Sequence, residues 1–469
     1  MSRTRNAQED TMRSPASTRP PRRPRSARSG PPGVPTTTLA RRQLLALAAA
    51  LPVGAGALAA CSDASGTQLT SQVEHEQVPL SEVESLLPGA VTASNALGSA
   101  IIADYLTEEP AGNALVSPLS LSLVLALLAP GAADPGAQGF DELLGASGED
   151  RDRTWSAIQT SVNRNDGDLD GFDPEEIPAE PLVHLANHVV IREGAEVSQD
   201  YLDTVLRWLD AQVEQVPGDR IKANLDEWAE TNTGGLIPAS GIKPTADTAL
   251  VLQNALLFAA RWASPFDTAD TFPQDFTRAD GSTVEAELMH ATLALPYVTG
   301  EGWAAVRLDY EGGQSETGQG LALDVVLPEA GTSPTDLGGE AWSAACDALD
   351  EQARATERVE VELALPTLDL TGPATDLLAL LTGQGLDPSD LGGIAPGLAL
   401  SAVVQQVRLI IDEEGTVAAA LSEAGMATSA PAPSTPVPFV VDHPYVLRLR
   451  DLDSGATLLE AVIMDPTAS

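Results

Sequence analysis

Cysteine is nearly absent from this chain, which has only Cys61 and Cys346 in 469 residues. If processing of the N-terminus consumes Cys61, Cys346 has no partner within the chain, so a disulfide framework is excluded. Basic residues are also scarce, with 26 lysines and arginines against 67 acidic residues, and ten of the 26 are arginines that precede residue 60. The rest of the chain is more acidic still, which argues against nucleic-acid binding.

The residue types that build metal and hydrolase sites are equally sparse. The five histidines are scattered, and His184 and His188, although four residues apart, lie on a strand-like segment that does not build a helical zinc pair. The chain has two lysines, and no serine-rich block leads into a convincing nucleophile elbow or Ser-x-x-Lys motif. We therefore expect no metal, no cofactor and no enzymatic activity.

The N-terminus has the composition of an export signal. Arginines are followed by an apolar run, residues 44–60, that is too short and too rich in small residues for a transmembrane helix. Its end, Leu58-Ala59-Ala60-Cys61, resembles the bacterial lipobox, in which a peptidase cleaves before a cysteine that carries diacylglycerol. An ordinary signal with an incidental cysteine is the alternative, and Arg41-Arg42 also fits twin-arginine export.

These features predict how the chain is divided. Residues 1–60 form a lipoprotein export signal, residues 61–81 form a polar tether without periodicity, and residues 82–469 form the folded domain. The protein is then extracellular, anchored by lipidated Cys61 to the outer face of the cytoplasmic membrane. We expect a monomer.

The hydrophobic pattern predicts an α+β domain with more than one sheet, because most strand-like runs are separated by helices or long loops. Residues 91–106 and 119–128 have helical periodicity, and residues 166–181 read as a solvated acidic insertion. The expected strands are residues 185–191, 249–258, 321–327, 358–365, 402–411, 444–449 and 458–464.

Several separated blocks occur in one order between about residue 95 and residue 466. They are residues 113–132 (NALVSPLSLSLVLALLAPGA), Leu185-Ala186-Asn187, Trp228 with Thr233-Gly234-Gly235-Leu236-Ile237, residues 254–289 from Asn254-Ala255-Leu256-Leu257-Phe258 to Met289, residues 439–447 (FVVDHPYVL) and Asp465-Pro466. Each alone is common, but together they resemble the serpin family. The resemblance implies a serpin-like fold of three β-sheets with about eight or nine helices and an exposed reactive loop, here about residues 413–438.

In a serpin, a target protease cleaves this loop and its N-terminal part inserts into the main sheet. The hinge here is Glu413, Glu414, Gly415, Thr416, Val417, Ala418, Ala419 and Ala420. Residues 416–430 contain no proline, which could not donate to a central strand. Counting alternately from Thr416 to Met426, one face carries only small or apolar side chains, and Glu423 lies on the other face. The loop can therefore insert without burying a charge.

The length of the family's loop places the reactive-site bond at Ser429-Ala430, with Thr428 or Met426 as alternatives because the loop is about four residues longer than is common. A small residue at this bond suits an elastase-like or subtilisin-like protease, with a small or apolar specificity pocket. Trypsin-like targets need a basic residue, which the loop lacks.

The family also implies a polar cluster where the main sheet opens. Ser117, Ser120 and Asn254 match it, whereas Gln405 stands at the position of the family's histidine and Trp262 matches the tryptophan where the loop first enters. Glutamine can still hydrogen-bond there, but the pH sensitivity of opening would change. Val417 replaces a glutamate that is frequent in inhibitory members.

These features predict a suicide-substrate inhibitor of serine-type proteases. The alternatives are a non-inhibitory serpin that acts only as a substrate or binding protein, and a solute-binding lipoprotein, which the anchor alone would suggest. Charges or prolines in the hinge beyond Gly415 would mark the first alternative, and they are absent. The second leaves the hinge pattern unexplained.

Overall fold

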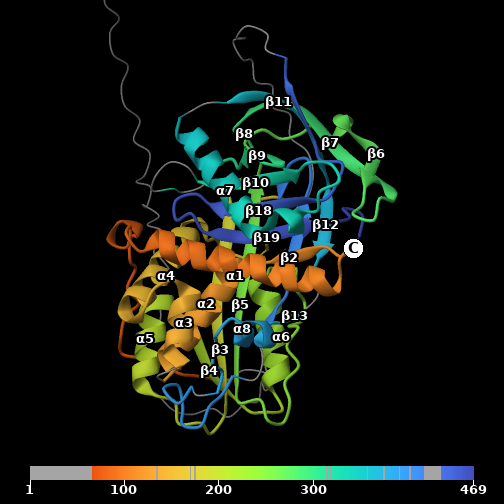
Figure 1. The fold of residues 1–469 in the computed structure, drawn as a ribbon. Helices are drawn as coiled ribbons and strands as arrows, with labels where there is room; N and C mark the ends of the chain where they lie inside the picture. The colour runs from red at the N-terminus through yellow and green to blue at the C-terminus, as the bar shows by residue number, and fades with distance from the viewer. Residues whose placement is uncertain are drawn as a thin grey trace, which may run out of the picture. The chain divides into compact units, whose positions relative to one another are not determined.

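Strands in this α+β protein collect into three large sheets, called A, B and C, and one two-stranded pair. The computed structural model describes residues 66–133, 136–169, 171–173, 176–312, 315, 320–355, 358–372, 375–389, 391–400, 403–416 and 435–468. Sheets B and C lie above helix α1, and most of sheet A lies below it beside α2 to α6 (Figure 1). Three sheets and the α+β class confirm the prediction made from the sequence.

In the described residues, sheet A has seven strands in the order β1-β4-β3-β5-β16-β15-β12. They are β1 Thr67–Gln68, β3 Leu182–Arg192, β4 Gln212–Val216, β5 Leu250–Arg261, β12 Leu368–Thr371, β15 Arg408–Ile411 and β16 Gly415–Thr416. β3 pairs antiparallel with β5 and parallel with β4. Because strand side chains alternate, one face of β3 packs on the main core and the other faces helix α6.

Sheets B and C hold most of the remaining strands. Sheet B consists of β2 Ala114–Val116, β19 Thr457–Ile463, β18 Tyr445–Asp451, β10 Leu321–Pro328, β9 Trp303–Asp309 and β8 Tyr297–Gly300. Sheet C consists of β17 Val437–Val440, β11 Val359–Pro366, β7 Thr283–Leu295 and β6 Thr271–Thr277, and the two-stranded pair is β13 Thr375–Asp376 with β14 Val404–Gln405. Every residue of β10, β18 and β19 is buried, so sheet B lies at the centre of the core.

Eight α-helices occur in the described residues, within the expected range. They are α1 Leu87–Glu108, α2 Pro118–Leu128, α3 Gly136–Leu144, α4 Gly148–Val162, α5 Gln199–Leu209, α6 Ile221–Asn232, α7 Pro334–Arg354 and α8 Leu378–Gly383. All of α2 is buried, and the Ser117 side chain caps it by accepting from the Ser120 backbone N–H. No described helix is both long and apolar enough to span a membrane.

Three local expectations differ from the structure, and the first is the strand expected at 402–411. Among the described residues it is divided into β14 and β15, because β14 leaves sheet A to pair with β13. Six other expected strands and both expected helices are found, with ends shifted by a few residues.

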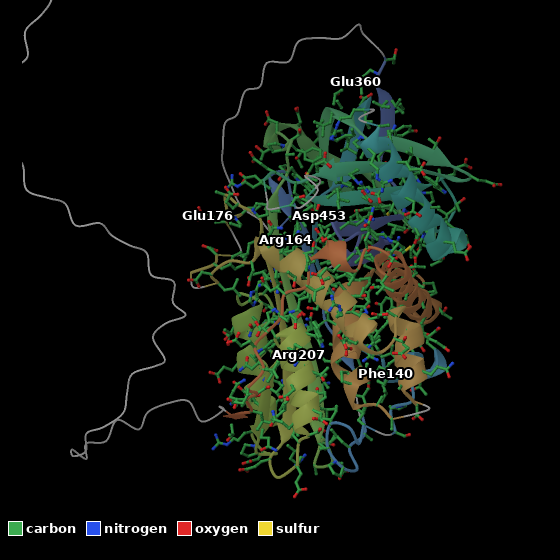
Figure 2. The ribbon with its side chains drawn as sticks, turned by 90° about the vertical axis from the view of Figure 1, so that its left-hand side faces the viewer. Phe140, Arg164, Glu176, Arg207, Glu360 and Asp453 are labelled. Atoms are coloured by element: carbon green, nitrogen blue, oxygen red, sulfur yellow. The ribbon has the colours of Figure 1, made fainter. Side chains whose placement is uncertain are left out.

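The second difference is the expected tether, because the folded body includes the chain from residue 66 onward. β1 pairs with β4, and Val78 and Leu80 are buried. Glu76 donates its backbone N–H to the carbonyl of Arg207, a residue of α5 that Figure 2 labels. Backbone pairing needs no hydrophobic periodicity, so the sequence pattern could not reveal this contact.

The third difference is the acidic segment 166–181, which is only partly solvated. Ile177 is buried, and Phe172 packs against the cluster of Leu182, Leu257 and Ala259. Arg261 donates to the carbonyl oxygen of Ile177 at 2.8 Å. The apolar residues inside the acidic run dock it on sheet A.

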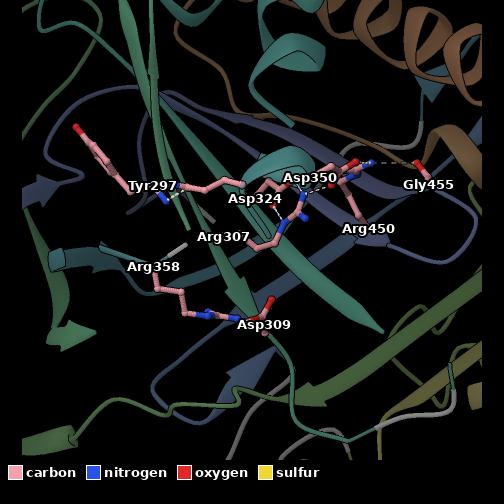
Figure 3. Close-up of polar contacts among 9 residues, drawn as sticks. Tyr297, Arg307, Asp309, Asp324, Asp350, Arg358, Arg450 and Gly455 are labelled. Atoms are coloured by element: carbon pink, nitrogen blue, oxygen red, sulfur yellow. Dashed lines mark hydrogen bonds and ion pairs between the residues drawn. The ribbon is translucent and has the colours of Figure 1, made fainter. Parts of the chain in front are cut away.

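A buried ionic network joins sheet B to α7 (Figure 3). Asp324 on β10 accepts from Arg307 at 2.6 and 2.8 Å and from Arg450 at 3.3 Å, and its side chain is 0% exposed. Asp350 on α7 completes the network, with its Oδ1 2.7 Å from Arg307 and 3.0 Å from Arg450. The two arginines hold the pKa of Asp324 below its ordinary value against the effect of burial.

Asp324→Asn should therefore destabilise the protein by about 3–5 kcal/mol, because two buried guanidinium groups lose a charged partner. Denaturant unfolding of wild type and variant measures this difference. The matched control is Asp369→Asn, whose side chain is 64% exposed and pairs with Arg408; it should cost less than about 1 kcal/mol. Equal effects of the two substitutions would contradict this role of the network.

Candidate functional site

The centre of sheet A contains a gap between β5 and β15. At the end of β5 the gap is bridged by the two residues of β16, which pair antiparallel with both neighbours: Thr416 lies opposite Ile411 and Ala260, and Gly415 opposite Arg261. Along the rest of the gap no direct pairing of β5 with β15 is found in the described chain. A cavity of about 100 Å³ lies there, lined by residues 254–258 of β5, residues 403–410, Thr416 and the segment after α6. The gap is therefore a place where a strand can be added.

Backbone contacts hold the first part of the hinge in place. The carbonyl oxygens of Glu413 and Glu414 accept from the N–H groups of Phe266 and Trp262, both at 2.8 Å. The Asp412 carboxylate accepts from the N–H groups of Glu414 and Gly415, and its pKa is raised because burial outweighs these bonds. The hinge residues after Thr416, the bond Ser429-Ala430 and the proposed lipidation site Cys61 lie outside the described residues.

Among the described hinge residues, Gly415 has a backbone position that leaves no room for a side chain. A Cβ atom there would lie 2.1 Å from the carbonyl oxygen of Ala260 and 2.9 Å from the Cα of Arg261. Gly415→Ala should therefore push β16 out of sheet A at a cost of about 1–3 kcal/mol. Faster cleavage near residue 415 in limited proteolysis, together with a lower unfolding temperature, would report it. An unchanged cleavage rate would contradict the close approach.

Trp262 lies where the hinge enters, as the resemblance implies. Its indole N–H donates to the carbonyl of Asp412 at 2.9 Å, and its ring stacks on Tyr310 at a centroid distance of 4.6 Å. The hydroxyl groups of Tyr310 and Thr416 are 2.6 Å apart, and burial raises the pKa of Tyr310, so this hydroxyl stays protonated. Trp262 and Tyr310 thus form the surface against which the first hinge residues pack.

Sequence reasoning missed Tyr310. Tyr310 follows β9, 48 residues after Trp262, and forms an isolated bridge with it. No sequence motif identifies Tyr310, since a buried tyrosine after a strand is common. The two rings are brought together by the isolated bridge between Trp262 and Tyr310, which directly follow β5 and β9. Asn187 belongs to one of the family blocks, but its contact with Asn254 was also not foreseen.

The sheet-opening residues divide between the two sides of the cavity. Gln405 accepts from the N–H of Ser117 at 3.0 Å and donates to its carbonyl at 2.9 Å, while the hydroxyl of Ser117 lies 2.9 Å from that of Ser120. Asn254, on β5, donates instead to Asn187 at 2.8 Å, and its Oδ1 has no partner among the described residues. The structure therefore brings Ser117, Ser120 and Gln405 together and leaves Asn254 across the gap.

The Gln405 amide makes both bonds to Ser117 without a titratable group. It replaces the histidine of the family pattern by a donor and an acceptor that do not change with pH. In the described part of the chain, no group of three or more histidine, cysteine, aspartate or glutamate side chains is arranged to hold a metal ion.

A family model described as "Serpin (serine protease inhibitor)" matches residues 92–466. The chain belongs to the serpin family. An uncharacterized serpin-like protein of Thermococcus kodakarensis is 27% identical over 377 residues, covering 77% of this chain and 83% of the relative. Serpin-Z2A of Triticum aestivum is also 27% identical, over 380 residues that cover 77% and 92%.

Solved serpin structures share the fold. The native state of the thermophilic serpin tengpin has a TM-score of 0.68 at 17% identity, covering 85% of this chain and 97% of tengpin. Human thyroxine-binding globulin with bound ligand has a TM-score of 0.67 at 21% identity, covering 82% and 100%. The family supports protease inhibition broadly, and serpins in general inhibit rather than catalyse.

Proposed function

We propose that this serpin is a suicide-substrate inhibitor of serine-type proteases. The observation that carries the proposal is that Gly415 and Thr416 already occupy the gap between β5 and β15, antiparallel to both. Continuing the chain past Thr416 in the same direction would extend β16 along the cavity. The sequence suits this, because residues 416–430 lack proline and their buried face would carry no charge.

Insertion would act mechanically on a bound protease. About 12 inserted residues at about 3.3 Å each would move an attached enzyme on the order of 40 Å. At the moment of cleavage the protease is joined to the loop as an acyl-enzyme, and displacement on that scale would deform its catalytic site before water hydrolyses the ester. We place the bond at Ser429-Ala430 and the target among proteases with small or apolar specificity pockets.

A non-inhibitory role remains the alternative within the family. Thyroxine-binding globulin, a structural neighbour, is solved with thyroxine bound. An inhibitor stays covalently attached to the protease after cleavage, whereas a substrate is released, so one assay separates them.

The test is incubation of residues 62–469 with subtilisin-like and elastase-like enzymes, followed by denaturing gel electrophoresis. We expect a covalent complex with the mass of the protease plus the part of the serpin that precedes the cleaved bond, because the fragment after that bond is the leaving group and separates on denaturation. The matched control is the same protease with its catalytic serine replaced, which should give neither cleavage nor complex. Complete cleavage of the loop with no complex would defeat the inhibitor proposal and leave the fold intact.

We also propose that the protein is exported and held at the outer face of the cytoplasmic membrane by lipid on Cys61. The support is the lipobox resemblance and the position of β1, Thr67–Gln68, which belongs to the folded body and follows Cys61 closely in the sequence. Cys61→Ser should release the protein from membranes, which fractionation and the mass of the mature N-terminus would detect. Retention of the variant in the membrane fraction would contradict the anchor. We expect a monomer, which light scattering can test.

A further inference from the structure

Helix α6 and the turn after it cover the gap in sheet A. Thr233, Leu236 and Ile237, directly after the helix, line the cavity between β5 and the 403–410 segment. The helix itself packs on sheet A through Ile221 and Leu225. A strand that fills the cavity therefore has to displace this segment, so whatever fastens α6 to the sheet opposes insertion.

Two histidines on β3 lie under α6. His188 is 0% exposed, and its ring stacks on Trp228 of α6 at a centroid distance of 5.0 Å. Gln253 on β5 donates to its Nδ1 at 3.2 Å, which leaves the proton on Nε2. That nitrogen lies 3.6 Å from a Glu214 oxygen on β4, too far for a hydrogen bond, and has no other partner in the described residues. Neutral His188 thus packs against the helix with one unused polar atom.

His184 lies four residues earlier on the same strand and contacts the C-terminal end of α6. Its Nδ1 is 2.7 Å from the Asp166 carboxylate, in the segment between α4 and β3. Its Nε2 is 3.3 Å from the side-chain oxygen of Asn232, the last residue of α6. Protonated His184 donates to both oxygens at once, so its charged form joins three elements.

We propose that His184 and His188 make α6 a pH-sensitive clamp over the insertion site, firmest near pH ~6.5 and weaker on either side. The proposal rests on the proposed function, because the clamp matters to inhibition only if the loop inserts. His188 accounts for the weakening of the clamp at low pH, the acid limb of the profile, and His184 for its weakening at high pH, the alkaline limb.

The two limbs have opposite signs because the two environments are opposite. Burial lowers the pKa of His188 despite Glu214, so its contribution to docking is complete above the ordinary histidine value and is lost as the pH falls. The pKa of His184 is raised: Asp166 and Asn232 outweigh burial. Its contribution is complete below the ordinary value and is lost as the pH rises through the raised one.

The charged groups that act on these rings are Asp166 and Glu214. The nearby His188 ring, with hydrogen bonds from Asn224 of α6 and from Gln212, lowers the pKa of Glu214 to about 2, so Glu214 stays ionised between pH 5 and pH 8. From α6 the rings face Trp228 and Asn232, and from β5 Gln253, all neutral. The pH dependence therefore belongs to the two histidines.

The experiment follows the rate at which intact protein loses inhibitory capacity, and the protection of α6 amides from hydrogen exchange, between pH 5 and pH 8. The wild type should lose inhibitory capacity most slowly near pH ~6.5. The protection of its α6 amides, corrected for the intrinsic pH dependence of exchange, should be highest there. Both quantities should change by about threefold to tenfold toward pH 5 and toward pH 8. His184→Gln should remove the alkaline limb, and His188→Gln the acid limb. The matched control, His290→Gln on β7, should keep both limbs.

If His188→Gln fails to fold, Glu214→Gln replaces it: without the carboxylate, protonated His188 is less tolerated and the acid limb should deepen. The clamp is overturned if the protection of the α6 amides does not depend on pH, or if its pH dependence is the same in these variants as in the wild type. This holds even if a covalent complex forms at every pH. A bell-shaped profile without a complex at any pH keeps the clamp and rejects the inhibitor function instead.

Discussion

Thr416→Arg should convert the inhibitor into a substrate, with the yield of covalent complex falling by roughly 100-fold while loop cleavage continues. Thr416 is 3% exposed, lies between β5 and β15 and contacts the Tyr310 hydroxyl. An arginine there would keep β16 out of sheet A in the intact protein, and loop insertion would then have to bury the guanidinium group without a partner, at a cost of about 3 kcal/mol or more. Since about 1.4 kcal/mol is a factor of ten, insertion would lose the competition with hydrolysis of the acyl-enzyme. The ratio of complex to cleaved protein on denaturing gels measures this.

The matched control is Val417→Arg, one residue further along. By strand alternation its side chain would face the other side of the sheet, so complex formation should fall far less. Equal loss in both variants would show that any charge in the loop disturbs recognition. In that case the alternation argument would be wrong.

Cleavage of the loop between Met426 and Pro433 should raise the unfolding temperature by on the order of 10 °C or more. The added strand would gain ladder bonds to β5 on one side and β15 on the other, each worth about 1 kcal/mol net, so about 12 residues contribute on the order of 10 kcal/mol. The change in unfolding temperature follows from that gain. Thermal unfolding before and after nicking, with a protease that forms no complex, measures it.

Nicked Thr416→Arg provides the control, since the same bond is cut but insertion is opposed. It should show little gain in unfolding temperature. A nicked wild type no more stable than the intact protein would mean that the cut loop stays outside sheet A.

Much of the fold follows from local pattern. β3, β5, β10, β18 and β19 were predictable because each is a continuous apolar or alternating run, and α2 because Ser117-Pro118 begins an apolar stretch. The division of residues 402–411 into β14 and β15 was not, because the run stays apolar while its pairing partner changes. Pairing is a property of two segments, and one segment's sequence does not contain it.

The site shows the same limit. Ser117, Ser120 and Gln405 could be named together through the family blocks, although 285 residues separate Ser120 from Gln405. Tyr310 could not, because its role arises from a hydroxyl 2.6 Å from Thr416 and a ring stacked on Trp262. From the sequence, the four-residue spacing of His184 and His188 on a strand indicates only that they do not form a helical zinc pair. Their pH-dependent role could not be predicted, because it depends on contacts with α6, β4 and the segment at Asp166.

The linear order of residues was sufficient for the family and for the order of the main elements, and it predicts an insertable face on the loop, because block order, apolar periodicity and strand alternation are properties of consecutive residues. Three features emerged only from the folded chain: Gly415 and Thr416 are already inserted, residues 66–81 belong to the body, and two histidines lie under α6. Each of these depends on contacts between segments far apart in the chain, whose geometry is set by packing of the whole domain.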